Sequence, residues 1–166
     1  NIIDRIKLPF RKEKELYSSL YTILGFYPRD ISYYKLALMH KSIMKRNAKG
    51  KPVNNERLEF LGDAVLELVT TDFLFSNYDK PEGILTAWRS ALVRTESIGA
   101  AGDKLGYEPL VRMSRGERHG SERARQQILA NAFEAVIGAI YLEKGYQAAA
   151  DFIAAHILCK LEQILA

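Results

Sequence analysis

The sequence predicts an all-α fold in one domain that covers residues 1–166. Apolar residues recur at helical spacing over most of the chain, and few segments show the alternating, β-branched pattern of strands. The chain has 166 residues, 48% of them hydrophobic and 27% charged, which is enough to bury a proper hydrophobic core.

The ends of the expected helices follow from the turn residues between them. The stretch "YPRD" at 27–30 separates the first two helices, and "NAKGKPVNN" at 47–55 and "YDKPEG" at 78–83 bound the third. Later breaks are "LGYEP" at 105–109 and "EKGY" at 143–146. The pattern predicts helices over 13–24, 32–43, 55–77, 83–93, 95–105, 122–143 and 147–164.

Charge and cysteine content exclude several classes of protein. The formal net charge is +4 and the isoelectric point about 9.1, which is compatible with a polyanionic partner but does not demonstrate one. The single Cys159 excludes an intrachain disulfide, and zinc is not expected because His40, His119 and His156 are far apart in the sequence. Without a signal peptide or a membrane-length apolar run, a cytoplasmic location and no membrane partner are expected.

An acidic stripe runs along the helix expected over 55–77. At 100° per residue its acids are neighbours, and i,i+4 like-charge pairs cost a few tenths of a kcal/mol each in an isolated helix. Asn55 is expected to cap this helix. The positive end of the helix dipole then stabilises Glu56 and Glu59 in the first turn, but not Asp63 and Glu67 further along. The stripe consists of Glu56, Glu59, Asp63 and Glu67, opposite a core face of Leu58, Leu61, Val65, Leu68 and Val69.

A second polar strip lies on the helix expected over 122–143. Apolar residues surround nearly the whole circumference of this helix, so it is expected to be largely buried: Ile128, Leu129, Phe133, Val136, Ile137, Ile140 and Leu142. The strip that remains holds Gln127, Asn131, Glu134 and Gly138, and the last of these indicates that another segment approaches the backbone. A buried Glu134 is costly unless it is paired or bound to a cation.

If the two strips face each other, Glu59, Asp63, Asn131 and Glu134 form an oxygen-rich pocket of the kind that Mg²⁺ prefers. Without a cation the clustered carboxylates repel one another and their pKa values rise. Spacing alone leaves two alternatives open, namely carboxylates on a solvated helix face and a Glu134 that pairs with a buried arginine.

An arginine-rich segment, "RMSRGERHGSERARQQ" at 112–127, stands apart from the helical pattern. Its arginines suit phosphate oxygens, which favours contact with a nucleic-acid backbone. A solvated loop explains the same composition, and the pattern does not separate the two. The arginines are Arg112, Arg115, Arg118, Arg123 and Arg125.

Four ordered motifs resemble those of the ribonuclease III family. "NERLEFLGDAVL" at 55–66 is similar to the family signature, and "LALMHKS" at 36–42 to its Leu-Thr-His-Lys/Arg-Ser region. "EGILTAWRSALV" at 82–93 and "ILANAFEAVIGAIYLEKG" at 128–145 resemble its Glu-Gly-x-Leu-Thr segment and second acidic motif. The resemblance implies an all-α, homodimeric endonuclease domain that cuts double-stranded RNA with Mg²⁺, for which Mn²⁺ can substitute, and leaves 5′-phosphate and 3′-hydroxyl ends.

The resemblance also implies roles for individual residues. Asp63 and Glu134 fall on the catalytic positions, and together with Glu59 and Asn131 they match the metal ligands. Phe60 falls where the family inserts an aromatic side chain into a socket on the partner subunit, and Glu67 matches no functional position. Residues implied to line the RNA valley are Glu56, Glu82, Arg89, Arg94, Arg115, Arg118 and Arg123.

Two departures from the family pattern affect this interpretation. Position 131 is Asn where most members have Asp, which removes one negative charge and favours weaker Mg²⁺ binding. The chain also ends at Ala166, before the double-stranded-RNA-binding domain of bacterial members, so weak and salt-dependent RNA affinity is expected. The nuclease interpretation, with processing of ribosomal and messenger RNA as its expected role, competes with a non-catalytic RNA-binding or ribosome-associated relative that only Asn131 favours.

Overall fold

The computed structural model describes residues 2–7 and 13–165, and these residues are predominantly helical. They contain no β-strand, and their only β-type pairings are the isolated bridges Met39–Arg112 and Arg46–Pro52. None of the described helices combines the length and the apolarity needed to cross a membrane. The helices are α1 (Ile2–Lys7), α2 (Lys14–Leu24), α3 (Ser32–Ala37), η2 (Lys41–Ile43), α4 (Glu56–Asn77), α5 (Glu82–Val93), α6 (Thr95–Leu105), η3 (Glu108–Leu110), α7 (Arg115–Arg118), α8 (Glu122–Lys144), α9 (Tyr146–His156), η4 (Leu158–Lys160) and α10 (Leu161–Leu165).

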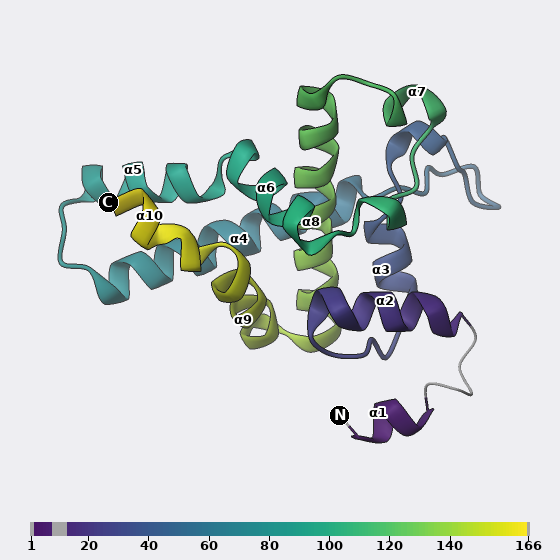
Figure 1. The fold of residues 1–166 in the computed structure, drawn as a ribbon, viewed down its shortest axis with the longest axis horizontal. Helices are drawn as coiled ribbons and strands as arrows, with labels where there is room; N and C mark the ends of the chain where they lie inside the picture. Colours follow the sequence, from purple (N-terminus) through teal and green to yellow (C-terminus); the bar gives the residue numbers. More distant parts are fainter. Residues whose placement is uncertain (1, 8–12, 166) are drawn as a thin grey trace.

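Helix α8 forms the centre of the fold, as its apolar circumference predicts. It crosses α4 near the middle of the molecule, with α6 and α3 beside it (Figure 1). The side chains of Leu129, Phe133, Ile137 and Ile140 are fully buried there, while Leu142, near the end of α8, is exposed, contrary to the expectation. The core of the domain is therefore built around α8.

Two glycines let α4 and α8 touch through their backbones. A Cβ on Gly62 would lie 1.6 Å from the Glu134 carbonyl oxygen, and a Cβ on Gly138 would lie 2.5 Å from that of Leu58. No side chain fits in either space. The segment that Gly138 was predicted to admit against its backbone is thus α4.

The expected helix over 32–43 is wrong beyond Ala37. The backbone of 38–40 pairs with other segments instead: Leu38 accepts a hydrogen bond from the amide of Arg112, and His40 donates one to the Arg112 carbonyl. Met39 accepts from the amide of Asn55, which leads the chain into α4. Tertiary pairing of the backbone overrides the local helical pattern here.

The expected helix over 147–164 is also interrupted. Helix α9 ends at His156, and Ile157 adopts φ −116° and ψ −56° before η4 and α10 begin. The irregular backbone turns Ile157, Leu158 and Leu161 into the core, where all three are buried. Helices α1 and α7 were not expected from the sequence.

Two details of α4 differ from the expectation. Asn55 occupies the N-cap position without capping, because its buried side chain donates to the Ala37 carbonyl, and Asn54 Oδ1 accepts from the Glu56 amide instead. Leu68, expected on the core face, is 57% exposed. Leu66, which the expected core face omits, is buried in its place.

Candidate active site

The crossing of α4 and α8 brings Asp63 and Glu134 together. Because the backbones touch at Gly62 and Gly138, the side chains beside these glycines meet across the crossing. The carboxyl of Glu134 is hydrogen-bonded to Asp63, which is exposed on the outer side of α4. Two acids that are 71 positions apart in the sequence (134 − 63) therefore share one site.

This arrangement raises the pKa of Glu134 to about 8. Burial is the largest cause, followed by the charge of Asp63 and by the hydrogen bond between the two carboxyls, with smaller contributions from Glu59 and Glu67. At neutral pH the Glu134 carboxyl therefore keeps its proton and donates it to Asp63. Among the described residues, no Lys or Arg forms an ion pair with Glu134, so the buried-arginine alternative is not supported.

Glu59 lies one turn before Asp63 and is partly buried. Burial is the first cause that raises its pKa, and the charges of Glu56 and Asp63 add to the effect. Lys41 partly offsets it. Glu56 is exposed in the first turn of α4, so these acids form a continuous negative surface.

Asn131 lies one turn before Glu134 on α8 and is partly exposed. Its Oδ1 accepts a hydrogen bond of 2.8 Å from Gln127 Nε2, one turn further back. A carbonyl oxygen has two lone pairs, so Oδ1 can still bind a cation while Gln127 holds its orientation.

The donor set at this crossing consists of oxygen atoms. Three carboxylates and one amide oxygen match the ligands that small divalent cations prefer. Burial and, after it, the neighbouring charge of Asp63 raise the pKa of Glu134. The described residues do not gather three carboxylate, imidazole or thiol groups at metal-binding distance. Glu59 and Asn131 would have to turn toward the Asp63–Glu134 pair to enclose an ion.

Arg89 and Glu67 are joined by an ion pair that the sequence interpretation missed. The nitrogen Nε of Arg89 lies 3.0 Å from Glu67 Oε1, and Nη1 donates to Thr71 Oγ1 at 3.0 Å. The pair fastens α5 to α4. The guanidinium expected to contact RNA is therefore already occupied by α4.

Glu82 does not join the acidic crossing within one chain. It begins α5, beyond the end of α4, and its Oε1 accepts from Thr86 Oγ1 at 2.6 Å. Asn77 ends α4 fourteen residues beyond Asp63 (77 − 63), about 21 Å along the helix axis. Glu82 instead borders a separate hollow between α4 and α5.

Phe60 projects away from the core and is 82% exposed. It neighbours Glu59 in the sequence and lies on α4, whose exposed surface also carries Leu68 and Phe75. An exposed aromatic ring beside an acidic site has no packing role within this chain.

The arginines expected to contact RNA differ in how the structure holds them. Arg115 and Arg123 are exposed, as is Arg94 between α5 and α6. Arg118 is exposed as well, but its Nη2 donates to the Val111 carbonyl at 2.8 Å.

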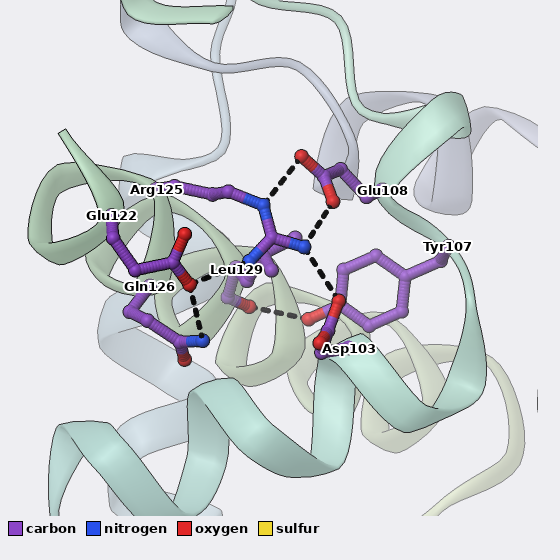
Figure 2. Close-up of polar contacts among 7 residues, drawn as sticks. All are labelled: Asp103, Tyr107, Glu108, Glu122, Arg125, Gln126 and Leu129. Carbon is purple, nitrogen blue, oxygen red and sulfur yellow. Dashed lines mark hydrogen bonds and ion pairs between the residues drawn. The ribbon is translucent and has the colours of Figure 1, made fainter. Parts of the chain in front are cut away.

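Arg125 is the clear exception among the arginines of 112–127. Its guanidinium donates to Glu108 at 2.8 and 2.5 Å, to Asp103 at 2.6 Å and to Glu122 at 3.0 Å (Figure 2). These hydrogen bonds raise its pKa still further. Arg125 is thus a structural link between α6, η3 and α8, and neither of the two alternatives left open for the arginine-rich segment describes it.

The sequence of the chain matches that of a known protein family. A family model described as ribonuclease-III-like matches residues 30–161, most of the chain. The chain belongs to this ribonuclease III family. Proteins named Ribonuclease 3 from Bacteroides fragilis and Phocaeicola vulgatus are 46% and 44% identical to it over 95% of the chain. The chain spans about half the length of these curated relatives, 53% and 50%.

Solved ribonuclease III structures have the same fold. Two structures of the nuclease domain from Campylobacter jejuni align with TM-scores of 0.73 and 0.71, at 36% and 33% identity. They cover 87% and 89% of this chain, and the chain covers 95% and 94% of them. The expected all-α ribonuclease III fold is therefore confirmed. The description of one of these structures refers to structural flexibility in a region involved in dimer formation of that nuclease domain.

One cluster of this ribonuclease III domain was missed in the sequence interpretation, although its motif was noted. His40 is buried, and its Nδ1 accepts from the Ser42 amide at 3.1 Å and lies 2.8 Å from Ser42 Oγ. Ser42 Oγ in turn accepts from the Ser114 amide at 2.9 Å. The "MHKS" motif thereby ties the segment before α4 to the arginine-rich segment.

Proposed function

We propose that this chain is the catalytic part of an endoribonuclease that needs Mg²⁺, or Mn²⁺ in its place, and cuts double-stranded RNA. The observation that carries the proposal is the contact between Asp63 and Glu134. Burial, the charge of Asp63 and the hydrogen bond between the two carboxyls raise the pKa of Glu134 to about 8, and no described Lys or Arg forms an ion pair with it. Membership of the ribonuclease III family supports the reaction class. The proposed role is processing of ribosomal and messenger RNA precursors in the cytoplasm.

Glu59, Asp63, Asn131 and Glu134 would hold the cation. When bound, Mg²⁺ polarises a phosphodiester and eases deprotonation of water. The pKa of about 8 applies to Glu134 without a cation, and a bound cation would favour the ionised carboxylate, so Glu134 would act as a ligand that holds the cation beside the attacking water. Water forms the new P–O bond, the bond to the 3′-oxygen breaks, and this oxygen takes up a proton, which leaves 5′-phosphate and 3′-hydroxyl ends.

A homodimer accounts for Phe60 and Glu82 together. A hollow of about 720 Å³ between α4 and α5 is lined by Leu74, Phe75, Tyr78 and Leu85, with Glu82 on its border. If Phe60 of a second copy inserts there, two-fold symmetry inserts the first copy's Phe60 into its partner. Each Glu82 then lies beside the partner's acidic crossing, although the two are far apart within one chain.

The dimer is tested by comparing two equally exposed side chains. Phe60→Ala should lower the fraction of dimer in sedimentation analysis, whereas Met44→Ala should leave it unchanged, because both side chains are 82% exposed but only Phe60 lies on α4. A dimer that survives Phe60→Ala unchanged would contradict the proposed insertion.

RNA would lie across the acidic surface with basic side chains beside it. A-form duplex is recognised through its shape, 2′-hydroxyls and phosphates, which suits exposed arginines better than a base-reading helix. The exposed Arg115 and Arg123 are the free candidates, together with Arg118, while Arg89 is available only if it leaves Glu67. Arg94 is exposed too, but it lines a different hollow at the end of α5.

The deciding experiment is cleavage of a long RNA duplex at low salt, with Mg²⁺ or with EDTA. The unmodified chain should cut only the RNA duplex, not single-stranded RNA or duplex DNA, and only with Mg²⁺. Glu134→Gln should abolish cutting, and Asp72→Asn, at an exposed acid on α4 outside the crossing, should not.

The alternative, a non-catalytic RNA-binding relative, rests on Asn131. It predicts that the chain binds duplex without cutting it. Asn131→Asp then separates two cases, since restored cleavage would show a weakened metal site and continued inactivity would exclude the nuclease.

A further inference from the structure

A second charged region lies away from the acidic crossing. A hollow of about 930 Å³ is lined by the end of α5, by α6, and by α9, η4 and α10. Helices α5, α9 and α10 lie on the side of the molecule away from α3 (Figure 1). The hollow shares no residue with the crossing and carries four basic side chains, Arg94, Lys104, His156 and Lys160.

The basic groups of this hollow lie close enough to repel one another. Burial lowers the pKa of His156, and the charges of Lys104 and Lys160 lower it further. Burial is also the main cause that lowers the pKa of Lys160, and Lys104 again contributes. Lys160 cannot simply swing away, because its Nζ donates to the Ser97 carbonyl at 2.8 Å.

Little negative charge in the chain offsets this group. Glu96 is the one carboxylate among the lining residues, and it is exposed. Within residues 2–7 and 13–165, neither Arg94 nor Lys104 nor Lys160 forms an ion pair. The basic groups are therefore left for an anion from outside.

The start of α6 adds to the positive potential. This eleven-residue helix begins at Thr95, between the lining residues Arg94 and Glu96, and its N-cap residue, Arg94, provides no side-chain acceptor for the first-turn amides. Free amides and the helix dipole favour an anion at such an end.

We propose that the hollow between α6 and α10 binds a phosphate group, carried either by an RNA backbone or by a free phosphorylated small molecule. Lys104 and Lys160 supply the charge, Arg94 can bind two phosphate oxygens at once, and the start of α6 supplies amides. The proposal does not depend on the nuclease activity.

The only cysteine of the chain provides a built-in reporter. Cys159 lines the hollow and is exposed, so a phosphate bound there should shield its thiol. The rate of alkylation by N-ethylmaleimide, an uncharged reagent, is followed by mass spectrometry in EDTA, so that RNA remains uncut. Millimolar pyrophosphate should slow alkylation at least threefold, whereas sodium chloride at equal ionic strength should not.

Two double variants that remove the same charge test the specificity. Lys104→Gln with Lys160→Gln should need at least tenfold more pyrophosphate for the same protection. Lys49→Gln with Lys51→Gln, in an exposed loop, should behave as the unmodified chain does. Protection is compared within each variant, because the substitutions themselves change thiol reactivity.

A short RNA duplex run beside pyrophosphate identifies the source of the phosphate. Protection by the duplex alone indicates the RNA backbone, and protection by pyrophosphate alone indicates a free small molecule. A bound anion should also raise the unfolding midpoint of the unmodified chain but not that of the Lys104/Lys160 variant. The site is excluded if neither probe protects Cys159 or raises the midpoint, or if both double variants respond alike.

Discussion

Two acidic clusters on α8 differ in what neutralises them. Glu122, Asp103 and Glu108 surround Arg125, which binds all three (Figure 2). Glu134, about three turns after Glu122 on α8, shares a proton with Asp63 of α4 instead, and the pKa of Glu134 rises to about 8. A cluster that contains its own cation is complete within the chain, whereas the crossing needs a proton or an ion from solution.

This difference separates a structural cluster from the one proposed to be catalytic, which residue type alone does not. Both groups consist of acids from segments far apart in the sequence, and both involve α8. A guanidinium bound to three carboxylates cannot release one without an energetic cost, so that group holds helices together. Carboxylates without a bound cation can exchange protons and ions, which is what catalysis requires.

The largest effect is expected at the crossing itself. Glu134→Gln keeps the volume but cannot provide an anionic ligand to the cation, and should lower duplex cleavage about a thousandfold, equivalent to about 4 kcal/mol of the barrier. Single-turnover rates with saturating enzyme measure this. A tenfold loss or less would assign Glu134 to the same structural class as the Arg125 acids.

A smaller effect is expected from separating the helices. Gly62→Ala places a Cβ against the Glu134 carbonyl, and should lower the free energy of unfolding by about 3 kcal/mol. Gly83→Ala, where a Cβ meets nothing within 4 Å, is the matched control. Urea denaturation compares them, and equal midpoints would show that the crossing tolerates a wider spacing.

Next in size is the loss of the neutralising arginine. Arg125→Met leaves three carboxylates without their cation and should destabilise the fold by about 2 kcal/mol, because the guanidinium is largely shielded from solvent. The control is Arg123→Met, an exposed arginine on the same helix, which should change the unfolding midpoint little. Similar losses in both variants would remove the contrast between the clusters.

The smallest effect concerns pH in the absence of divalent cations. Glu134 has a pKa of about 8 in the fold and 4.5 ordinarily, so the folded chain holds a proton that the unfolded chain releases between these values. The free energy of unfolding should therefore fall as pH rises from 4.5 to 8, by about 2 kcal/mol after allowance for solvent screening.

Glu134→Gln removes the titrating carboxyl. The difference in the free energy of unfolding between the unmodified chain and this variant therefore isolates the contribution of Glu134. Denaturation in EDTA at several pH values should show the unmodified chain losing stability relative to the variant across that window. Parallel curves would show that Glu134 ionises normally.

The positions of several helices could be predicted from the local sequence pattern. The bounds of α5, α6 and α8 agree with expectation within a residue, because their apolar periodicity and their breakers act locally. The break after Ala37 was not predictable in this way, because it depends on pairing of 38–40 with Arg112 and Asn55. The turn at Ile157 likewise serves the core and not the local helical pattern.

The candidate site shows the same division. The acidic stripe, the polar strip and Gly138 indicated the pair Asp63 and Glu134, since spacing on one helix is a local property. Local sequence does not show which arginines already form ion pairs. Arg125 and Arg89 lie in stretches whose sequence is compatible with RNA contact, and only tertiary contacts pair them with Glu108 and Glu67.

The contact between Gly62 and Gly138 also governs when the site comes into existence during folding. The residues are 76 positions apart (138 − 62), and neither helix alone places two of the acids across from each other. A partly folded or nascent chain in which α8 has not yet docked therefore has no assembled centre. Nuclease chemistry of the kind proposed would therefore require that α8 has docked onto α4.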